Sequence, residues 1–535
     1  MKKLLTLLLA GMLMTGVLVG CEKSVDESSG QQSEGGATNT PTEPRTDLTF
    51  AYFIGMESVS PHTTAGEMWF QEMVYETLVS VENSGIEPCL AEKWDISPDG
   101  LTYTFHLREG VTFTDGTPFD ANAVVKNFDN IHKDAESLKW LESIVLTESY
   151  RAVDDYTFEL VLSNPYYPLL TELGLARPYG MGSTEIFIEG EPRSVTSAVG
   201  TGPYYLADEV ANEYVVMEMN ENYWGDKPQI ETVTMKVIPD AQTRIMALEK
   251  GEIDLIYGLN VLDPATIKSY ADDENIHSKV SEPSATKHFV INSHIPGLDD
   301  PAVRYAISHA VNKEEIAEGI FYGIEEPAHT LFAENIPYCN VGLEPYNYDM
   351  ELATKLLDDA GWIMGDDGIR AKDGVKLSFE AVYDNDTVTD KYIFEFLKSE
   401  FAPLGIELNL TGYERATYFD IQKSGNFDIV MGIPWGSPYD PHTALASFRS
   451  PSYGDYQALS GLEGSEEIFA EITSFLAEVD EEVRAEEIKN VLTFIHEGAV
   501  HVPLVFESNK ALYTDELKEI TFAPSVYTFP FWDFK

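Results

Sequence analysis

The chain has 535 residues, 44% of them hydrophobic, and its 90 Asp and Glu residues against 35 Lys and Arg residues give a formal net charge of −55. This acidity argues against nucleic acid or an anionic lipid surface as a partner, because like charges repel. The length excludes a single hydrophobic core, so we expect at least two lobes.

The first 20 residues have the pattern of an export signal. Lys2 and Lys3 form a short positive region, and an uncharged apolar run extends from Leu4 to Val19. A bilayer takes roughly 20 apolar residues to cross, so this run is short for a membrane span. The end of the run, Leu-Val-Gly-Cys at residues 18–21, resembles the bacterial lipobox. The resemblance implies a signal peptide at residues 1–20 and lipidation of Cys21.

The segment that follows, residues 21–45, is rich in Ser, Gly, Glu, Thr and Gln and has no aromatic residue. Such a composition cannot bury enough apolar surface to offset the entropy of ordering, so we expect a flexible tether. No later stretch has an uncharged apolar run long enough to cross a membrane. We therefore expect the mature chain at the outer face of the cytoplasmic membrane, outside the cytoplasm and held by its lipid.

The rest of the chain alternates between strand and helix patterns, which is typical of the α/β class. Apolar residues with period two predict strands at 101–107, 156–162 and 232–238, and helical periodicity predicts helices at 68–78 and 122–131. Asp300 followed by Pro301 predicts a helix start, and a second helix should run from Asp349 to Asp359 and stop at Gly361.

Enzyme signatures are absent from the sequence. There is no His-Glu-x-x-His, no Gly-x-Ser-x-Gly, no phosphate-binding loop and no Cys-x-x-Cys pair. No internal repeat of the kind that builds an adhesin is visible after residue 45. We therefore predict a binding protein with no catalytic residues and no resident cofactor, and we regard an exported enzyme or an adhesin as the weaker alternative.

Several segments, in order along the chain, resemble the extracellular solute-binding proteins of the peptide, opine and nickel class of ABC importers. They are residues 90–105, 107–119, 200–204 (Gly-Thr-Gly-Pro-Tyr), 220–225 (Asn-Glu-Asn-Tyr-Trp-Gly) and 303–313. Each motif is weak alone, but the ordered set is specific and spans nearly all of residues 47–535. Within it, Gly200, Gly202 and Pro203 predict a rigid bend, since Gly allows a positive φ and Pro fixes its own.

The resemblance implies a two-lobed periplasmic-binding-protein-like α/β fold with a hinge and an extra subdomain in lobe I. We expect lobe I at residues 46–285, with the inserted subdomain at about 87–200, lobe II at 286–504, and a return to lobe I at 505–535. The ligand would lie between the lobes, which close around it by hinge motion. The implied partners are a small solute and the permease subunits of an ABC importer, and we expect a monomer.

Within this family the sequence is most similar to the nickel-binding receptors. The likeness is carried by residues 432–442, 449–456, 173–178 and 139–142. It implies pocket roles for Met68, Trp140, Arg177, Trp435 and Tyr439 around a nickel ion that arrives already chelated. The forked guanidinium of Arg177 would hold the carboxylates of the chelator, with the aromatic side chains as an apolar wall and Met68 as a soft flank.

The sequence departs from those receptors at two positions. Ser137 stands where they have a second pocket Arg, and Tyr453 stands where they have a His that reaches the metal. Imidazole suits Ni²⁺, whereas a neutral phenol is a poor ligand. The chelate would then need complete coordination of its own, unless His442 substitutes as metal ligand. His442 also reads as a residue at a helix start, and Arg449 is a candidate second contact to the anion or a surface Arg.

An oligopeptide receptor of the same fold is the alternative. Those receptors commonly hold the peptide ammonium with an Asp three residues after the Trp that corresponds to Trp435, and this chain has Pro438 there. The missing carboxylate argues against a peptide, although Asp440 is close in sequence.

Overall fold

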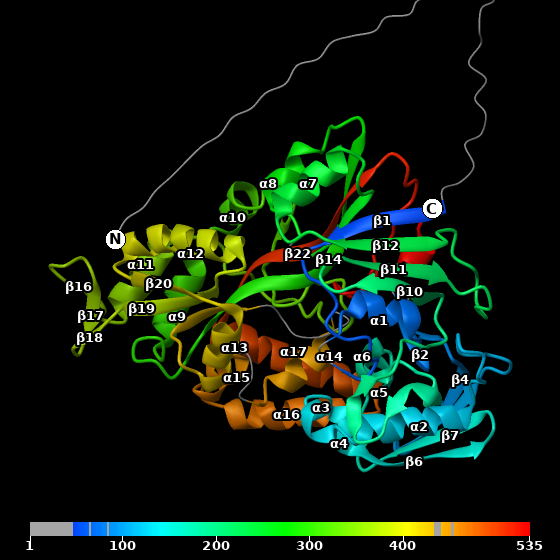
Figure 1. Ribbon diagram of the computed structural model, residues 1–535. Coiled ribbons are helices and arrows are strands. Elements are labelled where there is room, and N and C mark those ends of the chain that lie inside the picture. Colours follow the sequence, from blue (N-terminus) through cyan, green and yellow to red (C-terminus); the bar gives the residue numbers. More distant parts are fainter. Residues whose placement is uncertain (1–45, 64–65, 83–84, 260, 433–439, 451–453) are drawn as a thin grey trace, which may run out of the picture. The chain divides into compact units, whose positions relative to one another are not determined.

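The computed structural model describes residues 46–63, 66–82, 85–259, 261–432, 440–450 and 454–535. These residues form strands and helices that alternate along the chain, and the strands gather into one large sheet and several small ones (Figure 1). The mixed α/β class predicted from the sequence is confirmed.

The described residues contain one eleven-stranded sheet. In spatial order its strands are β10 (Tyr204–Val210), β11 (Tyr214–Met219), β12 (Thr232–Val237), β1 (Asp47–Tyr52), β13 (Leu255–Gly258), β22 (His501–Thr514), β14 (Ile276–Ile291), β21 (Ile429–Gly432), β19 (Ser378–Asp384) and β20 (Glu407–Tyr413), and β15 (Glu326–Pro327) pairs with β22 outside this path.

The two long strands β14 and β22 join the two halves of this sheet. At one end β22 pairs with β13 through Leu255 and Tyr513, and at the other end β14 pairs with β21 through Phe289 and Met431. Between these ends β14 and β22 pair with each other antiparallel. Strands from early residues and strands from middle residues therefore meet at this pair, which gives the two lobes. The exact lobe boundaries given above remain a prediction.

The smaller sheets lie outside the main one. They comprise β4 (Ala91–Ile96), β5 (Thr102–Leu107), β7 (Thr157–Leu162) and β6 (Thr147–Asp154) in one sheet, β2 (Val79–Glu82) with β3 (Gly85–Pro88), β8 (Phe187–Ile188) with β9 (Glu191–Val195), and β16 (Ile363–Met364) with β17 (Arg370–Lys372) and β18 (Val375–Lys376). The sheet that contains β5 lies within the predicted subdomain at about 87–200, whose boundaries also remain a prediction.

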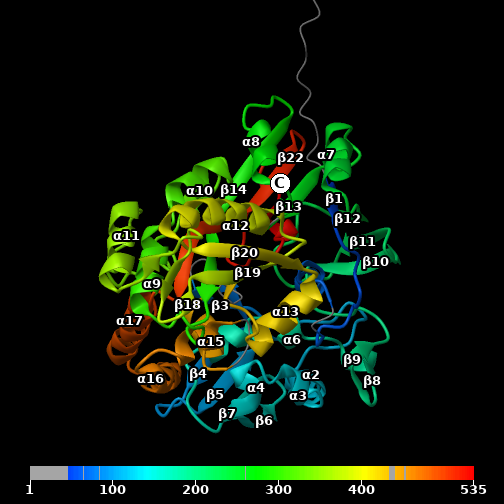
Figure 2. The same ribbon diagram turned by 90° about the vertical axis from the view of Figure 1, so that its left-hand side faces the viewer.

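Helices cover the sheets, as where α12 packs across β19 and β20 (Figure 2). The helices are α1 (Met68–Val74), α2 (Ala121–His132), α3 (Ala135–Leu138), α4 (Glu142–Leu146), α5 (Leu169–Leu173), α6 (Ala176–Tyr179), α7 (Ala241–Glu249), α8 (Pro264–Ser269), α9 (Pro301–His309), α10 (Lys313–Gly319), α11 (Met350–Asp359), α12 (Val388–Phe401), α13 (Arg415–Ser424), α14 (Pro441–Ser447), α15 (Asp455–Ser460), α16 (Ser465–Ala477) and α17 (Glu481–Gly498).

Separate apolar clusters lie on the different parts of the sheet. Phe50 on β1 is fully buried and meets Trp69 of α1 edge to face, with ring centroids 5.3 Å apart. Phe289 on β14 belongs to another cluster with α9 and α12. A third cluster contains residues of the β5 sheet together with residues of α14, α16 and α17. Apolar burial therefore also joins the predicted subdomain to the middle of the chain.

Among the described residues, no helix is both long enough and apolar enough to span a membrane.

Candidate functional site

Arg177 and Met68, two predicted pocket residues, lie on helices that pack together. Met68 opens α1 and is buried, and Arg177 lies in the short helix α6, which packs against α1. Arg177 has non-helical dihedrals, φ −116° and ψ 104°, and its Nη1 donates to the carbonyl oxygen of Gly66 at 2.9 Å. The structure therefore places the Arg177 guanidinium beside the start of α1, close in the chain to Met68.

Acidic groups surround Arg177. Burial lowers the pKa of the Arg177 guanidinium, and the nearby acidic groups Glu67 and Glu72 oppose this by favouring its charged form. Burial raises the pKa of Glu72 to about 7, although a hydrogen bond from Thr528 at 2.9 Å and the charge of Arg177 hold it down. Burial also raises the pKa of Glu67, again against the charge of Arg177. Arg177 thus keeps its positive charge in a partly desolvated, acidic setting.

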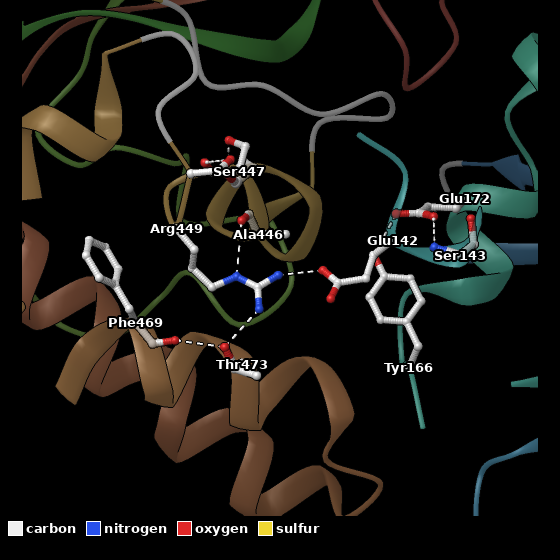
Figure 3. A network of polar contacts seen from close by, with 11 residues as sticks. Glu142, Ser143, Tyr166, Glu172, Ala446, Ser447, Arg449, Phe469 and Thr473 are labelled. Atoms are coloured by element: carbon white, nitrogen blue, oxygen red, sulfur yellow. Dashed lines mark hydrogen bonds and ion pairs between the residues drawn. The ribbon is translucent and has the colours of Figure 1, made fainter. Parts of the chain in front are cut away.

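Trp140 lies in the turn between α3 and α4, and its side chain is 49% exposed. Two residues later, Glu142 opens α4 and reaches across to Arg449, which follows α14 (Figure 3). The Arg449 Nη2 donates to Glu142 Oε2 at 2.5 Å, Nη1 donates to Thr473 Oγ1 at 2.8 Å, and Nε donates to the Ala446 carbonyl oxygen at 3.2 Å. Arg449 therefore links the Trp140 turn to the middle of the chain.

Ser143 and Tyr166, which are drawn near Glu142 in Figure 3, both donate to a second carboxylate, that of Glu172. Glu172 accepts from the Ser143 backbone N–H at 3.0 Å and from the Tyr166 hydroxyl at 2.6 Å, and it is buried. These bonds fix the first turn of α4, so the Glu142 side chain is presented from a rigid helix start.

His442 is the second residue of α14, which begins at Pro441 after the capping residue Asp440. Its Nδ1 lies 2.9 Å from Asp440 Oδ1, and its ring packs against Tyr167 and Tyr338 with centroids 5.0 and 5.3 Å away. Among the described residues, the buried Nε2 of His442 has no hydrogen-bond partner. The helix-start interpretation is confirmed, and the role as metal ligand stays a prediction.

Three predicted pocket residues, Trp435, Tyr439 and Tyr453, lie outside the described residues, as does the predicted lipidation site Cys21. Gly432 ends β21 just before the first two of them, and Gly454 precedes α15 just after the third. Gly432 is therefore the last described residue before the first segment, and Gly454 is the first described residue after the second.

Sequence reasoning missed four residues that contact the predicted site residues or their neighbours. Glu142 belongs to the motif at 139–142, but nothing local indicates its pairing with an Arg more than 300 positions away. Tyr167 donates its backbone N–H to the Leu476 carbonyl oxygen at 2.7 Å, and the Arg484 guanidinium lies 3.5 Å from its ring centroid. Glu67 and Glu72 lie in the segment around Met68 that resembles the nickel receptors, but they received no role, because an acidic residue in or beside a helix is ordinarily a solvated one.

Residues 85–456 match the family model of the bacterial extracellular solute-binding proteins, family 5. The chain belongs to this family, whose class of protein binds a solute outside the cytoplasm. It is 36% identical to the nickel-binding periplasmic protein of Escherichia coli over 91% of this chain and 94% of that protein. It is 29% identical to the dipeptide-binding protein of E. coli over 70% of this chain and 73% of that protein.

Among solved structures, the chain is similar to NikA from Brucella suis in complex with Fe(III)-EDTA. The TM-score is 0.89 and the identity is 39%, with 91% of this chain and 99% of that chain covered. This likeness confirms the two-lobed periplasmic-binding-protein fold and the resemblance to the nickel-binding receptors that the sequence motifs indicated.

Proposed function

We propose that this protein is the lipid-anchored receptor of an ABC importer and that it captures a nickel chelate, or a related transition-metal chelate, between its lobes for delivery to the permease. The observation that carries the proposal is the position of Arg177. Its guanidinium donates to the carbonyl oxygen of Gly66, two residues before Met68 opens α1, in a chain 36% identical to a nickel-binding protein along nearly its whole length.

The chemistry of Arg177 suits a carboxylate-bearing chelate. A guanidinium binds a carboxylate through two parallel N–H···O bonds, and a partly desolvated setting makes each bond count for more. An arginine stays protonated in proteins, so the guanidinium is charged before a ligand arrives, and the nearby Glu67 and Glu72 oppose the lowering of its pKa by burial. A ligand carboxylate would add a further anion to that setting, with Met68 and Trp140 as flanking soft and aromatic contacts.

A non-enzymatic role agrees with the names of the relatives, which are binding proteins. The metal would be cargo and not a resident cofactor, and we propose that the receptor works as a monomer with membrane-bound permease subunits.

We expect Arg177→Ala to weaken binding of a nickel chelate by about 30-fold or more. Removing one partner of a charge-assisted bond in a closed site costs roughly 2–5 kcal/mol, because the other partner stays buried and unpaired. Arg177→Lys should recover only part, since an ammonium keeps the charge and loses the fork. Titration calorimetry of the full chain with nickel plus histidine, and with nickel plus a polycarboxylate, measures both effects.

Arg151→Ala is the matched control, since this exposed Arg pairs with Glu159 on the neighbouring strand and lies on no predicted pocket element. A wild-type protein that ignores every nickel chelate and binds short peptides, with Arg177→Ala still binding those peptides, would replace the metal proposal by the peptide alternative. The likeness to the dipeptide-binding protein of E. coli keeps that alternative in view.

The lipid anchor has its own test. Cys21→Ala should abolish incorporation of labelled fatty acid and release the protein from the membrane fraction, because the thiol is the only proposed attachment point. Chelate binding by the purified variant should equal that of the wild type. Unchanged membrane attachment of the variant would refute the anchor and leave the binding proposal intact.

A further inference from the structure

Three side chains that the proposed function does not use lie together in the interior. His288 on β14, Asp455 at the start of α15 and His501 at the start of β22 are 1%, 6% and 5% exposed. One nitrogen of each ring and one carboxylate oxygen all lie within 4.8 Å of one another. They are far apart in sequence, so only the pairing of β14 with β22 and the packing of α15 on β14 bring them together.

The hydrogen bonds fix which atoms of His288 are free. Its Nδ1 lies 3.1 Å from the carbonyl oxygen of Thr286, and since a carbonyl only accepts, Nδ1 carries the proton. The Nε2 atom then presents a lone pair, and among the described residues this buried atom has no hydrogen-bond partner. Burial and the neighbouring His501 lower the pKa of His288 to about 3, so the ring is neutral at pH 7. A buried acceptor without a donor is costly, and a cation would satisfy it.

The other two residues, His501 and Asp455, are also held in place by contacts within the fold. His501 Nε2 donates to Asp455 Oδ1 at 2.9 Å, and an ion bound between these two atoms would take the place of that proton, which is released on binding. The ring of His501 stacks on Phe448 with centroids 5.1 Å apart and planes within 1°. The His288 ring is oriented by the backbone of Thr286, which is the kind of bond that orients metal-ligating imidazoles. Both rings are therefore fixed before any ion binds.

The separations suit a small transition ion. Ligands about 2.0–2.1 Å from a metal lie roughly 3–4 Å from each other, so closing the present spread of up to 4.8 Å takes shifts of a few tenths of an ångström per side chain. Imidazole ligands favour first-row transition ions over Mg²⁺ or Ca²⁺, and the carboxylate adds a negative charge that suits a divalent ion.

We propose that His288, Asp455 and His501 form a second metal site, separate from the surroundings of Arg177, which takes a divalent first-row transition ion directly and without a chelator. The ion would tie β14, α15 and β22 together. His288 pairs across the sheet with Gly432, the last residue before the segment that carries Trp435 and Tyr439. Occupancy would therefore stabilise the part of the fold from which the predicted pocket residues extend.

Co²⁺ in chelator-free buffer is the probe, followed by calorimetry, visible d–d absorption and thermal unfolding of the full chain. The wild type should bind one equivalent and unfold at a higher temperature with Co²⁺ present. His288→Gln and Asp455→Asn should each weaken binding at least about 30-fold and lose the thermal shift. Asp95→Asn is the matched control, because Asp95 makes the same 2.9 Å contact to a histidine, His106, at the surface, and among the described residues this pair belongs to no group of three possible ligands.

His288→Gln leaves the bond between His501 and Asp455 intact, so it tests the site even if Asp455→Asn folds poorly. Arg177→Ala should bind Co²⁺ like the wild type, which separates this site from the chelate site. A wild type that takes up no Co²⁺, or His288→Gln and Asp455→Asn variants that take it up as the wild type does, would overturn the second site and leave the chelate proposal untouched. A wild type that takes up Co²⁺ but binds no nickel chelate would support the second site and overturn the chelate proposal.

Discussion

Burial lowers the pKa of Arg177, and the nearby acidic groups oppose that change. Burial also raises the pKa of one of these groups, Glu72. Glu72 is partly buried, and its buried Oε2 has no hydrogen-bond partner among the described residues. Its pKa of about 7 lies well above that of a glutamate in an unfolded chain. The native state therefore binds a proton that the unfolded state has already lost between about pH 4.5 and pH 7.

Glu72→Gln should make the protein less sensitive to rising pH. The stabilising contribution of the protonated Glu72 is fully present below the unfolded pKa and is lost as pH rises through about 7. The variant carries no titrating group there, so at pH 8 it should exceed the wild type in stability by up to about 3 kcal/mol and by much less at pH 5. Denaturant unfolding at both pH values measures the difference.

The exposed Glu463→Gln serves as control and should show no such pH dependence. A Glu72→Gln variant that tracks the wild type at both pH values would show that the carboxyl is already ionised in the folded state.

Glycine at residues 200 and 202 has a different physical reason from the one the sequence suggested. Neither residue has a positive φ. A Cβ at Gly200 would collide with the carbonyl oxygen of Val74, and one at Gly202 would lie 2.5 Å from that of Met73. The motif is needed because two backbone segments approach each other closely at the end of α1, which only a residue without a side chain allows.

At the scale of single elements, local chemistry predicted the helix ends well. The helix α9 begins at Pro301 with Asp300 as its cap, and α11 runs from Met350 to Asp359 with Asp349 as its cap, as expected. Gly361 has the positive φ expected of a stop. The predicted helix 68–78 is wrong at its end, since α1 stops at Val74. There the Val74 carbonyl oxygen accepts from the Gly202 N–H at 2.9 Å, so a distant segment takes the place of the next helical turn.

Asp480→Ala should destabilise the fold by about 1 kcal/mol. Asp480 caps α17, the 18-residue helix Glu481–Gly498, and its carboxylate accepts from the backbone N–H groups of Glu482 and Val483. Losing the cap leaves these donors without a side-chain partner and removes a negative charge from the positive end of the helix dipole. Chemical denaturation gives the change in free energy. Asp226→Ala, at an exposed site outside any helix, should change it by less than about half as much.

At the scale of the whole described molecule, polar and aromatic contacts, together with the shared apolar cluster, hold the predicted subdomain against the middle of the chain. The ion pair of Arg449 with Glu142 is one, and the packing of Tyr167 against Arg484 and His442 is another. Both sides of the ion pair are partly buried, so it is worth more than a surface pair, whose value is about 0–1 kcal/mol. These contacts favour the arrangement in which the two parts touch.

Glu142→Gln should therefore weaken chelate binding by about 5-fold, because a ligand that needs the lobes closed must then supply more of the closing free energy. Calorimetry measures the affinity, and small-angle scattering of the ligand-free variant should show a larger radius of gyration. Glu159→Gln breaks an ion pair within one sheet and should change neither. Tighter chelate binding in Glu142→Gln would mean that the freed Arg449 contacts the ligand, as the sequence alone suggested.

The sequence by itself determined the family, the α/β class and several helix starts of this protein. Those features depend on residues within a few positions of one another, such as Asp300 and the backbone N–H of Ala302, so they can be read from a short window. The ordered family motifs also assigned Arg177 and Met68 to one ligand pocket, but only because the sequence resembles the nickel-binding receptors.

Only the tertiary structure decided which side chains meet. The acidic surroundings of Arg177, the pair of Glu142 with Arg449 and the cluster of His288, Asp455 and His501 join residues separated by tens to hundreds of positions. Neither the periodicity nor the spacing of residues in the sequence predicts these contacts. They depend on how β14 and β22 pair and on which helices pack against them. Burial at those crossings then sets the charge states that the sequence leaves open.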